Sequence, residues 1–163
     1  MEQTQDAATQ LVQTRLEMAQ QALTAGELAN AQSLFERALE VRGDHPERDA
    51  KIRDYLKQYS DEVAKQAPPN WAEAHRALNL LDTLKLQDDQ TSVWERKLWL
   101  KQADYQLKQK NLTESFEIFK NLMAAGERSA DQDKLKAEIS RIVRDNISYH
   151  AAQSEWALLG QII

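Results

Sequence analysis

Apolar side chains recur at helical spacing through most of this chain, in short blocks that turn-forming residues separate. In the segment 14–25, Leu16 and Ala19 begin a series with intervals of three and four residues, and the segment 29–42 continues it after Gly26. Residues at these intervals lie on one side of an α-helix, so each block predicts a helix with one buried face. A glycine between two such blocks fits the left-handed residue that ends a helix. The apolar series of this pair is Leu16, Ala19, Leu23, Leu28, Ala31, Leu34, Phe35, Ala38 and Leu39.

A second copy of the pattern lies further along the chain, on either side of Lys110-Asn111. This dipeptide is expected to form the turn between two helices. Phe119 stands in the second block where Phe35 stands in the first pair. The apolar and small positions of this copy are Trp99, Ala103, Leu107, Ser115, Phe119 and Leu122.

The copy in the middle of the chain is less regular. Its second helix follows the turn Ala67-Pro68-Pro69, with Asn70 as the expected N-cap, and carries Trp71, Ala74, Leu78 and Leu81 at helical offsets. Its first helix is expected within 50–66. At the position where a small residue would let the two helices touch, that helix carries Glu62. Its apolar face consists of Ile52, Tyr55, Leu56, Tyr59 and Val63. A polar loop follows this copy, and Thr91 or Ser92 is expected to cap the next helix.

The segment 131–163 predicts one long helix with an apolar stripe and a polar face. Residues such as Glu138, Arg141 and Asp145 form that polar face. The end of the segment, WALLGQII, is apolar all round, which is typical of an element that packs on the body or on another chain. The stripe consists of Leu135, Ile139, Ile142, Val143, Ile147, His150, Ala151 and Ser154.

Small residues stand where the first two helices would meet, with Phe35 as the large filler; they are Ala19, Ala31 and Ala38. This arrangement resembles the tetratricopeptide repeat, a helix-turn-helix unit of about 34 residues that stacks into a solenoid. The equivalent residues Ala31, Ala74 and Ser115 are 43 and 41 residues apart, so the helices or connections are longer here. The resemblance implies an all-α fold, a short solenoid of about three helix-turn-helix units with a long C-terminal capping helix. We expect a flexible N-terminus at 1–12, three hairpins at 13–129 and the capping helix at 130–163.

The resemblance also implies a binding face, because the first helices of tetratricopeptide units line a concave groove. The positions carried over are apolar in the centre and polar at the edges, which suits an extended or helical peptide with apolar anchors. The alternative is that the same side chains pack on neighbouring helices. The groove positions are Gln13, Leu16, Gln20, Leu23, Leu56, Tyr59, Val63, Lys97, Leu100, Asp104, Leu107 and Lys108.

Composition and charge narrow the list of partners. The net charge is −5 and basic residues alternate with acidic ones, whereas nucleic-acid binding needs clustered Lys and Arg. We therefore expect no nucleic acid. The chain has no cysteine, its first residues lack the features of a signal peptide, and no apolar run is long enough to cross a bilayer. These features predict a soluble cytoplasmic protein, or such a domain of a longer one, without membrane insertion.

No arrangement of residues indicates catalysis. The three histidines, His45, His75 and His150, are far apart, and adjacent acids such as Asp61-Glu62 point about 100° apart on a helix. Phosphate-binding loops and the Gly-x-Ser-x-Gly elbow are absent from the sequence. We therefore expect a protein that is not an enzyme and that needs no metal or cofactor.

The leading hypothesis is a non-catalytic interaction module that binds a peptide or protein in its groove. A first alternative is self-assembly into a homodimer through the C-terminal helix, because the end of that helix, Trp156 to Ile163, is apolar. The contact residues would be Trp156, Leu159 and Ile162. A second alternative is a regulatory domain of a larger signalling protein.

Overall fold

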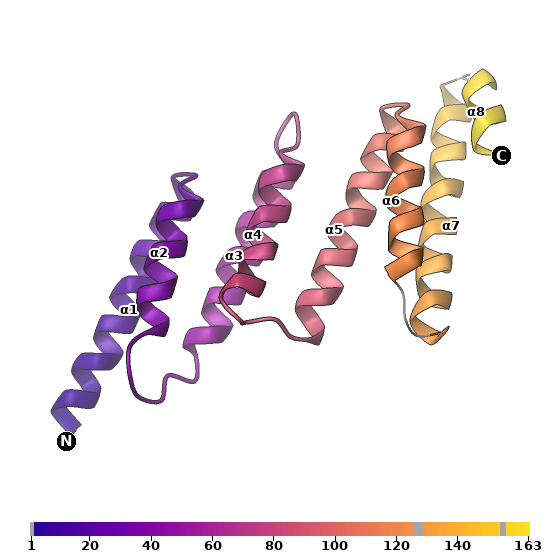
Figure 1. Ribbon diagram of the computed structural model, residues 1–163. Coiled ribbons are helices and arrows are strands. Elements are labelled where there is room, and N and C mark those ends of the chain that lie inside the picture. The colour runs from indigo at the N-terminus through magenta and orange to yellow at the C-terminus, as the bar shows by residue number, and fades with distance from the viewer. Residues whose placement is uncertain (1, 126–128, 154–155) are drawn as a thin grey trace. The chain divides into compact units, whose positions relative to one another are not determined.

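The computed structural model describes residues 2–125, 129–153 and 156–163, and this part of the chain folds into eight α-helices (Figure 1). The all-α prediction is confirmed. None of the described helices is both long and apolar enough to cross a membrane. The helices are α1 (Glu2–Thr24), α2 (Leu28–Leu39), α3 (Arg48–Ala64), α4 (Trp71–Thr83), α5 (Asp89–Lys108), α6 (Leu112–Ala125), α7 (Ser129–Ala152) and α8 (Trp156–Ile162).

The chain divides into two compact units, Met1–Glu95 and Arg96–Ile163, with the boundary inside α5. In the first unit α1 pairs with α2, α3 pairs with α4, and α1 also packs against α3. The small residues Ala19 and Ala31 are fully buried, and so is Phe35, as the pattern predicts. Gly26 has φ +78° after α1, which confirms the predicted left-handed helix end.

Helix α1 begins at Glu2, although we expected residues 1–12 to form a flexible extension. Val12 is buried in the first unit, so the apolar face of α1 extends further towards the N-terminus than the pattern suggested. The side chain of Gln5 lies against the α2–α3 loop, 3.3 Å from the place of a Cβ atom on Gly43. These contacts give the first turns of α1 a surface to pack on.

In the middle hairpin the small packing residue is Ser60, not the position of Glu62. Ser60 is buried, and its Oγ donates a hydrogen bond of 2.9 Å to the carbonyl oxygen of Ala74 on α4. Glu62 is exposed. The sequence pattern places the small position of α3 at Glu62, two residues too late. In the structure α3 and α4 approach closely at Ser60, which is itself a small residue.

Two helix starts show side-chain capping. Asn70 accepts a hydrogen bond of 3.2 Å from the backbone nitrogen of Glu73, which confirms the predicted N-cap of α4. At the start of α5 the cap is Asp88, whereas we expected Thr91 or Ser92. Asp88 Oδ1 accepts from the Thr91 nitrogen, and Thr91 Oγ1 accepts from the Asp88 nitrogen, both at 2.9 Å. The pair satisfies two backbone donors reciprocally, as a capping box does.

In the second unit α5, α6 and α7 lie side by side (Figure 1). Ser115 on α6 donates a hydrogen bond of 2.9 Å to the carbonyl oxygen of Ala103 on α5, so small residues again mark the closest approach. Trp99, which we expected in the core, is 39% exposed. The core of the unit consists of Leu100, Ala103, Leu107, Phe119, Leu135 and Ile142.

The predicted single helix at 130–163 is two helices in the structure. α7 ends at Ala152 and α8 begins at Trp156, and α8 packs back against α7 (Figure 1). The sequence explains this break, because apolar residues lie on one side of α7 but on all sides of the segment that forms α8. Turning back lets α8 bury Leu159. The C-terminal segment is thus a further helical hairpin with a short second helix.

Candidate functional site

The predicted groove positions separate into two groups by burial. The polar ones, such as Gln13, Gln20, Lys97 and Lys108, are exposed, and Asp104 is half-buried. The apolar ones contact neighbouring helices inside their own unit; the buried set is Leu16, Leu23, Leu56, Tyr59, Val63, Leu100 and Leu107. Most of the apolar groove positions are therefore buried between helices and not exposed for a ligand, which is the alternative given in the sequence analysis.

One groove brings four of the predicted positions together. It lies between α5 and α7, has a volume of about 330 Å³ and takes Lys97, Leu100, Asp104 and Lys108 from α5. Leu100 and the buried Ile142 of α7 supply its apolar floor. Charged side chains of both signs form its walls, and those that the prediction lacked are Lys101, Glu138, Arg141 and Asp145.

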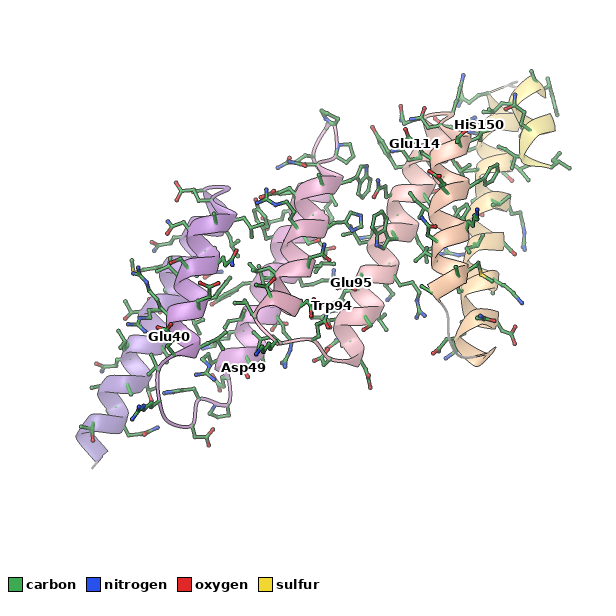
Figure 2. The ribbon with its side chains drawn as sticks, in the orientation of Figure 1. Glu40, Asp49, Trp94, Glu95, Glu114 and His150 are labelled. Carbon is green, nitrogen blue, oxygen red and sulfur yellow. The ribbon has the colours of Figure 1, made fainter. Side chains whose placement is uncertain are left out.

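A chain of polar contacts fixes one end of this groove. Lys108 Nζ lies 2.8 Å from one carboxylate oxygen of Asp104, and the side-chain amide of Asn146 donates to the other oxygen at 2.7 Å. His150, fully buried one turn further along α7, lies with Nε2 2.9 Å from the carbonyl oxygen of Leu107 (Figure 2). A carbonyl only accepts, so this nitrogen carries the proton and donates. The contacts of Asn146 and His150 hold α7 in register with α5, whereas the Lys108–Asp104 pair lies within α5.

The α7 side of the groove was missed because we treated the segment as a cap with a solvated polar face. Glu138, Arg141 and Asp145 belong to that face, yet they line the groove. A signal was present in the sequence. Ile142, Asn146 and His150 recur every four residues, and polar groups within an otherwise apolar stripe indicate contact with another helix rather than a closing face.

The first unit has two smaller hollows beside α1. One, of about 290 Å³, lies between α1 and the α2–α3 loop; it contains the predicted Gln13 and Leu16 together with His45 and Arg48. The other, of about 70 Å³, contains Gln20, Leu23 and Tyr59. Tyr59 donates a hydrogen bond of 3.0 Å to Glu73 Oε1. Burial, followed by that bond and the Glu73 charge, raises the pKa of Tyr59 to about 12. This hydroxyl therefore ties α3 to α4.

The residues predicted for self-assembly are not equivalent in the structure. Trp156 is 70% exposed, Ile162 is half-buried and Leu159 is buried against the second unit. Leu159 therefore packs within its own chain. Ile163, which the prediction did not include, is 90% exposed.

Two histidines of the described residues are buried and lie close to backbone carbonyl oxygens. His45 is buried with Nε2 3.1 Å from the Arg42 carbonyl oxygen, and His150 makes the analogous contact described above. Among the residues that the structure describes, no three His, Asp or Glu side chains gather closely enough to hold a metal ion. The groove between α5 and α7 therefore stays the candidate site.

Comparisons of the chain with protein-family models, with curated proteins and with solved structures gave no match. The resemblance to tetratricopeptide repeats, and the binding role that it implies, therefore stay predictions.

Proposed function

We propose that this chain is a short, divergent tetratricopeptide-like array that binds a protein segment and performs no catalysis. The α5/α7 groove carries the proposal. It gathers an apolar floor and walls of both charges between two helices that pair through buried polar contacts. A groove of this kind suits a peptide with one or two apolar anchors flanked by charged side chains.

The volume of about 330 Å³ limits what the groove accepts. It lies at the lower end of the usual range for ligand pockets and has room for a few side chains, not for a folded domain. The floor residues Leu100 and Ile142 are already buried, so a peptide would cover them rather than displace them. The affinity would then depend on the charged walls and on how well they are desolvated.

A displayed library of random twelve-residue peptides, selected on the full chain, tests this proposal. Lys97→Glu with Arg141→Glu changes two exposed residues in the groove walls. The matched control is Lys65→Glu with Lys85→Glu, which makes the same charge change at exposed residues outside this groove. Circular dichroism shows whether both variants keep their helical content.

We expect selected peptides whose affinity falls at least about tenfold in the Lys97/Arg141 variant, or about 1.4 kcal/mol, and stays unchanged in the control. Peptides that bind both variants as they bind the original chain would overturn the proposal. A selection that yields no binder to the groove would do the same.

Self-association through α8 is the second candidate, because Trp156 and Ile163 expose large apolar surface on the short helix and its end. In this case Trp156→Ser would turn a concentration-dependent dimer into a monomer in sedimentation equilibrium. A chain that is monomeric before the substitution contradicts this candidate.

A further inference from the structure

Helix α6 carries more apolar surface than the second unit covers. Its sequence LTESFEIFKNLMAA holds six large apolar residues, yet only Phe119 among them is buried. Phe116 is 39% exposed, and Met123 is half-buried. By contrast α2, with Phe35 at the same place relative to the helix start, buries Leu28, Ala31, Leu34, Phe35 and Ala38.

The uncovered surface continues onto α7 as a groove of about 260 Å³. Phe119, Met123 and Ile139 supply its apolar surface, and the remaining lining residues are Lys120, Lys136 and Ser140. The short helix α8 lies beside the C-terminal end of α7, whereas these α7 residues lie in its N-terminal half (Figure 1). The second helix of the last hairpin therefore leaves this part of the face open.

This groove and the α5/α7 groove use opposite sides of α7. Successive helical residues are about 100° apart, so Lys136, Ile139 and Ser140 lie on one side. Glu138, Arg141 and Ile142 lie on the other. The two grooves share no lining residue, so each can be changed independently of the other. A ligand of the α6/α7 groove thus does not require that the α5/α7 groove binds a peptide.

The charges of the groove indicate what would cover it. Of its six lining residues two are charged, and both are lysines, in a chain with a net charge of −5. A symmetric contact of this groove with itself would bring lysines towards lysines. Docking of α8 from a second copy would offer little counter-charge, because WALLGQI contains no acidic residue and Glu155 is the single acid next to it in the sequence. Both forms of self-association therefore leave at least one of the two lysines without an acidic partner.

We propose that the α6/α7 groove docks an amphipathic helix of a partner protein. Its apolar stripe fills the groove, and acidic side chains beside that stripe pair with Lys120 and Lys136. A helix is the expected shape because the groove runs between two helices, and such grooves accept residues spaced three and four apart. The acidic side chains add specificity and speed of association more than affinity.

A displayed library of helical peptides tests this proposal. Each peptide keeps a fixed leucine stripe at i, i+3/i+4 and i+7, and its flanking positions are randomised among Glu, Lys, Gln and Ser. Selection on the full chain is followed by fluorescence anisotropy with the enriched peptide and with the same peptide carrying Lys for Glu. The variants are Lys120→Glu with Lys136→Glu and, as the matched control, Lys65→Glu with Lys85→Glu, two exposed lysines outside both grooves.

We expect enrichment of Glu beside the stripe and at least a tenfold loss of affinity in the Lys120/Lys136 variant, with no loss in the control. The charge-swapped peptide should bind that variant better than it binds the original chain. Enrichment of Lys, no flanking preference, or no peptide that depends on this groove would overturn the proposal. A dimer in sedimentation equilibrium that the Lys120/Lys136 variant dissociates would overturn it too, because the occupant would then be a second copy.

Discussion

Helices α2 and α6 begin alike and are buried differently. Each has a phenylalanine eight residues into the helix, Phe35 and Phe119, and each meets a partner helix through small residues. α2 is followed by the 17-residue α3 and the 13-residue α4, whereas α6 is followed by the long α7 and the seven-residue α8. The two hairpins that follow therefore differ mainly in their second helix, which is short after α6.

The pairs α1–α3 and α5–α7 differ in a second way. The residues that α3 buries in the first unit are mainly apolar. The hydrogen bonds of Ser60 and Tyr59 on α3 reach α4 and not α1. Asn146 and His150 of α7, whose side chains are fully buried, instead make polar contacts with α5. Polar contacts fix one register more strictly than apolar packing does. The second unit thus combines a fixed helix pair with open surface, which is the combination that a binding site needs.

The largest expected effect tests the difference in burial. Phe35→Ala removes a fully enclosed ring and should lower the free energy of unfolding by about 3–5 kcal/mol. Phe119→Ala should cost less, because a groove already reaches that ring and less packing is lost. Urea denaturation followed by circular dichroism measures both changes. Equal losses would contradict the view that α6 is the less covered helix.

The next effect tests the polar register of the second unit. Asn146→Asp keeps the shape of the side chain but places a carboxyl 2.7 Å from an Asp104 oxygen. Like charges at that distance raise the pKa of the new carboxyl, and the free energy of unfolding should fall by about 2–3 kcal/mol at pH 7. Since the folded pKa is the higher one, the penalty should vanish as the pH falls below the ordinary aspartate value of about 4.

The exposed Asn121 on α6 provides a matched control for this substitution. Asn121→Asp makes the same chemical change at an exposed position, where solvent screens the charge of Glu117 one turn earlier on α6, so it should alter stability by less than about 0.5 kcal/mol. Thermal denaturation at pH 7 and at pH 3 compares the two variants. If they lose the same stability at pH 7, the Asn146–Asp104 contact does not hold α7 in place.

The sequence was sufficient for the all-α fold class and for much of the small-residue packing, because Ala19, Ala31 and Ser115 follow a strict local period. It did not predict the start of α1 or the break between α7 and α8. It was misleading at Glu62, where Ser60 was not recognised as the small residue because a serine is common on both surfaces and interfaces. The groove was only half predictable. Lys97 and Asp104 follow from the position of α5, whereas Arg141 depends on the packing of α7 against α5. That contact joins residues about forty positions apart, which local periodicity does not encode.

The smallest expected effect concerns Glu95, near the start of α5 in the first unit (Figure 2). Burial raises the pKa of Glu95 above its ordinary value of 4.5, and the charge of Asp82 raises it further. The protonated form is therefore favoured on folding, so the stability that it contributes is present below about pH 4.5 and is lost as the pH rises through the folded pKa. Glu95→Gln should accordingly raise the melting temperature at pH 7 and leave it unchanged at pH 3.

Solvent screening should keep the gain from Glu95→Gln below about 1 kcal/mol, because the side chain is only partly buried. Asp82→Asn should give a smaller gain in the same direction, since it removes the second of the two causes. The double variant should then gain less than the sum of the two single changes, which a double-mutant cycle measures. Full additivity would show that Asp82 does not act on Glu95, and a gain that persists at pH 3 would assign the effect to packing instead of charge.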